Sequence, residues 1–138
     1  MSRSFWLAAQ ALVALTLMAG CGPSLVPVQG KVTVDGLPLT TGNITYYPAD
    51  GKAQDETNVG YATVQSDGTY KLADGKSGIA AGKYKVVITA GMPSNPADPY
   101  SVPISLVNSQ FSELARTPLE VEVSPDAPAD RYDLKVTK

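Results

Sequence analysis

Residues 28–48 read Val-Gln-Gly-Lys-Val-Thr-Val-Asp-Gly-Leu-Pro-Leu-Thr-Thr-Gly-Asn-Ile-Thr-Tyr-Tyr-Pro and have the clearest strand pattern in the chain. Val32 and Val34 alternate with polar residues, which is the period of a strand with one buried face. The pair that follows, Asp35-Gly36, combines residues that readily adopt positive φ in a tight reversal. The second half of the stretch alternates in the same way around Ile44. We therefore expect two strands that fold back on each other and pair.

Five further segments have strand character, and with the first two they make seven candidate strands. They are Val59–Val64, Tyr70–Leu72, Lys83–Ile88, Leu119–Val123 and Tyr132–Val136. A second tight reversal is expected at Gly68, which follows Asp67. With 12 Gly and 11 Pro, the chain favours many short strands joined by turns. The sequence therefore predicts an all-β fold, a single antiparallel β-sandwich of about seven strands.

Composition excludes several classes of function. The net charge is -2 and no run of Lys or Arg occurs, which argues against nucleic-acid binding. The chain has no histidine, so the commonest general base and the commonest metal ligand are both missing. Its single cysteine, Cys21, cannot form an intramolecular disulfide or a multi-cysteine zinc site. We therefore expect a protein that is not an enzyme, with no cofactor and no metal.

The N-terminal residues have the layout of a secretory signal. Arg3 provides a cationic start, and the apolar run from Phe5 to Leu17 is shorter than the ~20 residues needed to span a membrane. The segment ends in Leu17-Met18-Ala19-Gly20-Cys21, which resembles the lipobox of bacterial lipoproteins. In that family, small residues precede a cysteine that is diacylated before the signal peptide is cleaved. The alternative is an ordinary cleaved secretory peptide with a chance cysteine.

The lipobox resemblance implies a signal peptide over residues 1–20, a lipid anchor on Cys21 and a short linker over residues 21–27. Each buried methylene of an acyl chain contributes about 0.8 kcal/mol, so two or three chains hold a protein on a membrane for its lifetime. The linker residues after the cysteine, 22–27, reach only about 20 Å when fully extended. We therefore expect the domain in the cell envelope, on the extracytoplasmic side and close to the membrane.

Three segments of the remaining chain follow in the order Gly30–Leu39, Ser66–Leu72 and Ala81–Ile88, and together they resemble the carboxypeptidase regulatory-like domain. A fourth segment, Thr117–Val123, with the short strand after it, is similar to small bacterial lipoproteins built around that domain. The resemblance covers nearly all of residues 26–138, and we assign the domain to residues 28–138. It implies a transthyretin-like (prealbumin-like) β-sandwich and an envelope setting. Members of the family mostly have no assigned molecular function, so the resemblance implies a fold and not a reaction.

The seven tyrosines allow two interpretations. Four of them share the apolar faces of their strands, and we expect them to fill the core with their hydroxyls at its edge; they are Tyr46, Tyr70, Tyr84 and Tyr132. Three others, Tyr47, Tyr61 and Tyr100, are freer and make carbohydrate binding the alternative function. An exposed coplanar pair of aromatic rings would favour that alternative.

The longest connection between candidate strands, Gly91–Pro118, is the candidate contact surface. Its four prolines between Gly91 and Pro103 exclude a central strand or helix there, and residues 107–114 predict one helical turn. Connections alternate between the two ends of an antiparallel sandwich, so this one is expected at the end away from the membrane. Tyr100 and Phe111 are its candidate contact residues, unless the segment covers a sheet edge and packs Phe111 into the core.

These observations predict a lipid-anchored protein of the cell envelope that acts as a non-catalytic structural or interaction module. Its expected partners are the membrane, through the lipid on Cys21, and an envelope protein or polysaccharide. Binding of carbohydrate or of another envelope polymer through exposed tyrosines and loops remains the alternative function. No nucleic-acid partner is expected.

Overall fold

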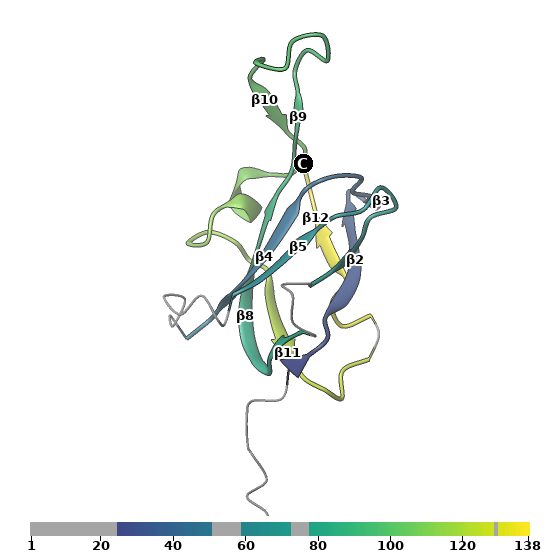
Figure 1. Ribbon diagram of the computed structural model, residues 1–138. Helices are drawn as coiled ribbons and strands as arrows, with labels where there is room; N and C mark the ends of the chain where they lie inside the picture. Colours follow the sequence, from purple (N-terminus) through teal and green to yellow (C-terminus); the bar gives the residue numbers. More distant parts are fainter. Residues whose placement is uncertain (1–24, 51–58, 73–77, 129) are drawn as a thin grey trace, which may run out of the picture.

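The computed structural model describes residues 25–50, 59–72, 78–128 and 130–138, which form a nearly all-β protein (Figure 1). The predicted all-β class is therefore confirmed. The expected signal motif, Leu17–Gly20, and Cys21 lie outside the described residues. The strands are β1 (Leu25–Val26), β2 (Gln29–Val34), β3 (Leu37–Pro38), β4 (Asn43–Pro48), β5 (Gly60–Thr63), β6 (Thr69–Lys71), β7 (Ile79–Ala80), β8 (Gly82–Thr89), β9 (Gly91–Pro93), β10 (Pro103–Ser105), β11 (Glu120–Val123) and β12 (Leu134–Val136). A short 3-10 helix, η2, spans Ser109–Ser112.

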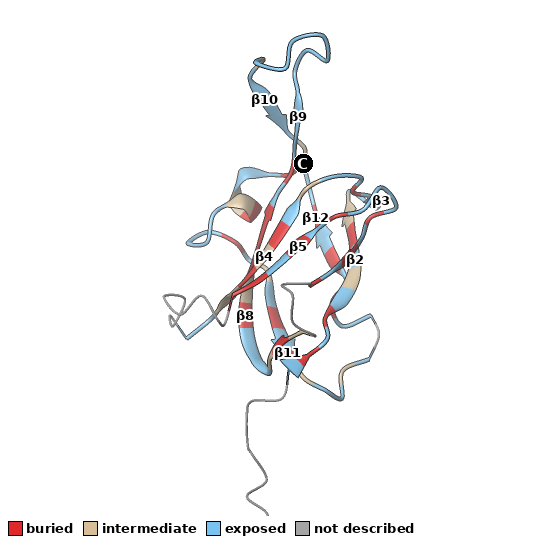
Figure 2. Ribbon diagram, in the orientation of Figure 1, coloured by how far each residue is buried: buried red, intermediate tan, exposed pale blue. Residues whose placement is uncertain are grey.

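Two larger sheets enclose the core. One is antiparallel, with strand order β11-β8-β4-β5, and the other has the order β12-β2-β3, with β6 also paired to β2. Buried side chains from both sheets form one hydrophobic cluster between them, which Figure 2 shows as the red segments of the facing strands. In β8 the inward residues are Tyr84, Val86 and Ile88, as their alternation with Lys83 and Lys85 predicts.

The predicted pairing within residues 28–48 is wrong, because β2 and β4 belong to different sheets. The Asp35-Gly36 reversal, with φ of 49° and 85°, joins β2 to the two-residue strand β3 instead. Leu39 is then buried in the core, and the chain crosses to the opposite sheet, where β4 pairs with β5 and β8. The alternation shows which side chains face inward, but it does not select the neighbouring strand.

The fold is also not wholly antiparallel. The last strand, β12, pairs in parallel with β2, with Leu134 opposite Val32 and Val136 opposite Val34. The backbone N–H of Asp35 donates to the carbonyl of Val136 at 3.0 Å and extends this contact into the turn. A parallel neighbour needs a crossover between the strands, and here the whole chain from β3 to β11 provides it.

The domain begins earlier than its predicted boundary at Val28. Leu25 and Val26 form β1, which pairs with β7 in the register Leu25 to Ala80 and Val26 to Ile79. Val26 is 5% exposed and belongs to the core cluster. The linker predicted over residues 21–27 therefore does not extend beyond residue 24.

The four tyrosines expected in the core are buried there, but the hydroxyls of Tyr46 and Tyr70 lie inside the core and not at its edge. Tyr46 and Tyr70 have 0% and 2% exposure, and their hydroxyl oxygens are 2.6 Å apart. The Tyr70 hydroxyl also donates to the backbone carbonyl of Tyr132. Tyr84 donates to the carbonyl of Ala80 at 2.7 Å. These hydrogen bonds satisfy polar groups that would otherwise be costly to bury.

Candidate functional site

A two-stranded hairpin projects from the body of the domain, and we call residues 91–105 the arm. Its strands β9 and β10 pair antiparallel, with Met92 opposite Ile104, and it extends from the end of β8 (Figure 1). Every residue of both strands is exposed, so no other segment that the structure describes covers either face of the hairpin (Figure 2). A two-stranded hairpin without a covered face has little stability of its own in water. The arm therefore depends on its base and its tip for order.

Hydrogen bonds hold both ends of the arm. At the base, the N–H of Leu106 donates to the carbonyl of Ala90 at 2.9 Å. At the tip, the side chain of Asn95 accepts from the N–H of Ala97, and that of Asp98 accepts from the N–H of Tyr100, each at 3.0 Å. Side-chain acceptors of this kind replace backbone partners in tight turns. The tip is consequently held in shape by hydrogen bonds within the arm.

The prolines of the arm limit what its edges can bind. Pro93 and Pro103 are cross-strand neighbours. The hydrogen bond from Leu106 to Ala90 shows that the backbone groups of this pair face each other across the hairpin. Such pairs alternate along an antiparallel ladder, so the backbone groups of Ile104 and Met92 also face each other. The nitrogens of the next pair, Pro93 and Pro103, therefore face outward. A proline in that position costs no bond inside the hairpin but removes a donor from its outer edge. The arm is therefore suited to contact through side chains and poorly suited to accept a further strand.

The exposed side chains of the arm are mainly apolar. Eight large hydrophobic residues in the described chain are exposed, and four belong to the arm: Met92 at 49%, Tyr100 at 94%, Val102 at 79% and Ile104 at 53%. Asp98 is the one charged residue among positions 91–105. Concentrated exposed apolar surface of this kind is typical of an interaction site. The sequence predicts only Tyr100 of these four as a contact residue, although Val102 and Ile104 on either side of a proline were a signal for an exposed strand.

Phe111 is not a contact residue, contrary to the prediction. It lies in η2, is 5% exposed and belongs to the core cluster. The following residue, Ser112, donates its hydroxyl to the carbonyl of Ile88 at 2.9 Å and fastens η2 to β8. The connection 91–118 thus divides into an exposed arm and a packed segment, because only its second part carries apolar side chains that can reach the core.

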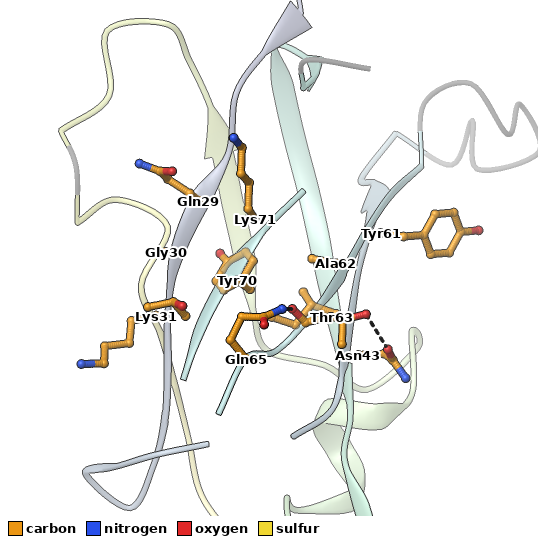
Figure 3. A pocket seen from close by; sticks show the side chains of 12 residues that line it. Gln29, Gly30, Lys31, Asn43, Tyr61, Ala62, Thr63, Gln65, Tyr70 and Lys71 are labelled. Atoms are coloured by element: carbon orange, nitrogen blue, oxygen red, sulfur yellow. Dashed lines mark hydrogen bonds between the residues drawn. The ribbon is translucent and has the colours of Figure 1, made fainter. Parts of the chain in front are cut away.

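A groove opens at the edge of the domain between the two sheets. Its volume is about 870 Å³, and it is lined by Gln29, Gly30, Lys31, Asn43, Ile44, Tyr61, Ala62, Thr63, Gln65, Thr69, Tyr70 and Lys71 (Figure 3). These residues come from β2, β4, β5, β6 and the turn between the last two. Ile44, Ala62 and Tyr70 are buried at its base. The groove is not predictable from the sequence pattern, because it forms between strands of different sheets.

The exposed tyrosines do not form the paired platform that sugar binding would use. Tyr61 lies on β5, and Figure 3 shows its ring turned away from Tyr70 and the groove. Tyr100 lies on the arm. Among the described residues, the close ring pairs are the buried ones, Tyr46 with Tyr70 and Tyr46 with Tyr84, both tilted.

The acidic residues near the groove have a structural role. No Asp or Glu is among the twelve described residues that line it. Nearby Asp67 accepts from the hydroxyl and the N–H of Thr69 at 2.6 and 3.0 Å, and these hydrogen bonds hold the pKa of its carboxyl below the usual value. Asp67 thereby stabilises the turn in which Gly68 has a φ of 86°. In the described segments, no three His, Cys, Asp or Glu side chains gather in a way that could hold a metal ion.

Comparison of the chain with protein-family models, with curated proteins and with solved structures gives no match in any of the three. The described part of the chain also contains no helix long and apolar enough to cross a membrane. The fold and its exposed surfaces therefore carry the functional argument.

Proposed function

We propose that this protein is a lipid-anchored, non-catalytic interaction module of the bacterial cell envelope, and that its arm contacts a partner protein. The observation that supports this proposal is the arm itself, which exposes four large apolar side chains and is covered on neither face. Apolar side chains that no part of the domain covers are exposed to water, which is unfavourable. Burial of these side chains against a partner removes them from water and stabilises the complex.

The N-terminal sequence supports the membrane anchor. The Leu17–Cys21 segment resembles a lipobox, and the domain resembles the carboxypeptidase regulatory-like domain found in envelope proteins. Because β1 begins at Leu25, only residues 22–24 separate the domain from Cys21. A connection of that length spans about 14 Å at most, so the domain would sit directly on the membrane surface.

The position of the arm agrees with this arrangement. In Figure 1 the arm extends from one end of the domain, and β1, the darkest purple strand, lies at the opposite end, close to the end of β11. A domain anchored through Cys21 would therefore direct the arm away from its own membrane. Its partner would be an envelope protein with an apolar contact surface, because the arm has almost no charge to recognise a charged ligand.

Site-specific photocrosslinking in bacteria that produce the full chain tests the proposal. We expect a photoreactive residue at Val102 to crosslink to one discrete envelope protein, and Ile104→Ser to abolish that product. A photoreactive residue at Leu37 is the matched control, because Leu37 is 71% exposed but lies in β3, away from the arm. Equal crosslinking from both positions, or none from Val102, would contradict a contact role for the arm.

The anchor needs a separate test. Cys21→Ser should prevent acylation and the cleavage that depends on it, so the precursor should accumulate with its signal peptide. Mass analysis of the mature N-terminus and detergent partitioning measure both effects. A wild-type protein that is cleaved but carries no acyl chain would refute the anchor while leaving the proposal for the arm open to its own test.

A further inference from the structure

The two strands beside the groove, β5 and β6, form a hairpin that separates beyond its turn. At the turn, the N–H of Gln65 donates to the carbonyl of Thr69 at 2.8 Å, and that of Gly68 donates to Gln65 at 2.9 Å. Beyond it, β5 pairs with β4 and β6 pairs with β2, which belong to different sheets. Among the described strands, β5 pairs only with β4, and β6 pairs only with β2. Within the described structure, two strand edges without a partner therefore border the groove.

The backbone groups that face the groove follow from the bonds on the paired sides. Val64 donates its N–H to Gly42, toward β4, so by alternation the backbone groups of Tyr61 and Thr63 face away from β4. Within the described structure, the Thr63 carbonyl has a long contact of 3.4 Å with the Gln65 side-chain amide, drawn in Figure 3.

The same reasoning applies to β6. Leu72 donates its N–H to the carbonyl of Val28 at 2.9 Å, toward β2. The backbone groups of Lys71 therefore face away from β2, toward the groove. Each side of the groove thus presents main-chain donors and acceptors of the kind that bind an added strand.

The spacing of a β-sandwich fits a single inserted strand. Packed sheets lie about 10 Å apart and paired strands about 4.8 Å apart, so one strand placed between two edges of different sheets is within pairing distance of both. The volume of about 870 Å³ is open above Ile44, Ala62 and Tyr70, so an inserted strand would also cover apolar surface.

The charge of the groove indicates the chemistry of the inserted strand. Lys31 and Lys71 are both exposed, and they are the charged members of its lining, which contains no carboxylate. The carboxylates of Asp67 and Asp133 lie close to Lys31 and offset part of its charge, so Lys71 is the lysine that best suits a contact with the ligand. Carboxylate side chains on the ligand would complement it.

We propose that the groove between β5 and β6 binds one extended segment of a partner protein by strand addition, and that this segment carries carboxylate side chains. The proposal goes beyond the function assigned to the arm, because the prolines of the arm exclude this mode of binding there. It defines a second contact site, on the edge of the domain, with main-chain bonds for affinity and Lys71 for selectivity.

Fluorescence anisotropy on the full-length protein in detergent micelles tests this site. The probe is a labelled peptide of alternating Asp and Val, about eight residues long. We expect saturable binding of this peptide, and no binding when Lys replaces its Asp residues or when Pro replaces its central Val. Lys71→Glu should weaken binding about tenfold, whereas Lys135→Glu, the same charge change on an exposed position of β12, should leave it unchanged.

A second variant tests the backbone contact. Thr63→Pro removes an N–H that faces the groove while leaving the bonds of β5 to β4, and we expect it to weaken binding at least about tenfold. Amide NMR shifts on peptide addition should concentrate at Tyr61, Thr63 and Lys71. Equal binding of the Asp and Lys peptides, or equal affinity in Lys71→Glu and Lys135→Glu, would overturn the proposal.

A second copy of the chain is the competing occupant. Concentration-dependent dimerisation that Lys71→Glu abolishes, together with no binding of the Asp peptide, would assign the groove to self-association and refute our proposal. Ile104→Ser should leave peptide binding unchanged, because Ile104 lies in the arm. The peptide assay therefore tests the proposal for the groove, and the crosslinking assay separately tests the proposal for the arm.

Discussion

The hydroxyl oxygens of Tyr46 and Tyr70 lie 2.6 Å apart in the core, although Tyr46 belongs to β4 and Tyr70 to β6, in different sheets. Tyr70 donates to the carbonyl of Tyr132, so the proton between the two tyrosines comes from Tyr46. Their ring centroids are 6.4 Å apart with an interplanar angle of 37°. This pair therefore joins the two layers by a polar contact at the base of the groove.

Tyr70→Phe should destabilise the domain by about 2–3 kcal/mol, because it leaves both the Tyr46 hydroxyl and the Tyr132 carbonyl without a partner. Tyr46→Phe should cost only about 1 kcal/mol, since Tyr70 keeps its bond to Tyr132. Denaturant unfolding measures both values, and Tyr61→Phe, at a half-exposed position, should have little effect. Equal costs for the two core variants would contradict the assigned direction of donation.

Stability should fall above pH 10. Burial is the main cause that raises the pKa of Tyr46 and Tyr70 above the ordinary value of 10.0. At higher pH the folded protein keeps protons that the unfolded chain has lost. The stabilisation is therefore complete below pH 10 and is lost as the pH rises toward the folded-state pKa. Each tyrosine should contribute about 1.4 kcal/mol per pH unit to this decline.

Urea unfolding at several pH values above 10, combined with tyrosinate absorbance, measures that decline. Tyr46→Phe should reduce the slope by about 1.4 kcal/mol per pH unit. A stability profile that is flat over this range would show that the buried hydroxyls ionise without cost.

The two turn glycines should differ in their tolerance of a side chain. Gly36 and Gly68 have φ values of 85° and 86°, so Ala at either position should cost about 1 kcal/mol in backbone strain. A Cβ on Gly36 has no neighbour within 4 Å, whereas one on Gly68 would lie 3.0 Å from the Cβ of Pro38 and 3.1 Å from the oxygen of Val32. Thermal unfolding should therefore show a greater loss for Gly68→Ala, and the reverse order would contradict the crowding at this turn.

The arm and the packed segment that follows it should respond differently to truncation of apolar side chains. Ile104→Ser should change the free energy of unfolding by no more than about 0.5 kcal/mol, because Ile104 is exposed. Phe111→Ala should cost about 3–5 kcal/mol, because it removes a ring from the core. Chemical denaturation of the two variants provides the comparison. A large loss for Ile104→Ser would mean that the arm supports the fold.

The proposed lipid anchor also predicts an orientation. Figure 1 shows the arm and the loop after β11 at opposite ends of the domain, and Asp126 is an exposed residue of that loop. On spheroplasts, Val102→Cys should react with a bulky thiol reagent faster than Asp126→Cys, because the membrane shields the end nearer the anchor. Acylation of Cys21 would leave no native thiol to compete. Faster labelling at position 126 would mean that the arm faces the membrane.

Local features of the fold were predictable from the sequence. Alternation placed Tyr84, Val86 and Ile88 toward the core, because successive side chains of a strand point to opposite faces. The two Asp-Gly pairs marked reversals, because few other residues accept positive φ at low cost. Such properties depend on a residue and its immediate neighbours.

Which strands pair with each other depended on the tertiary structure. The sequence alone determined which residues face inward and where the chain turns, since period and backbone strain are local. It did not determine that β2 would pair with β3, β6 and β12 and not with β4. Nor did it determine that Phe111 would be buried while Tyr100 stayed exposed. Those outcomes, like the Tyr46–Tyr70 contact and the groove between β5 and β6, depend on how all apolar faces are buried together, because burial is shared among segments distant in sequence.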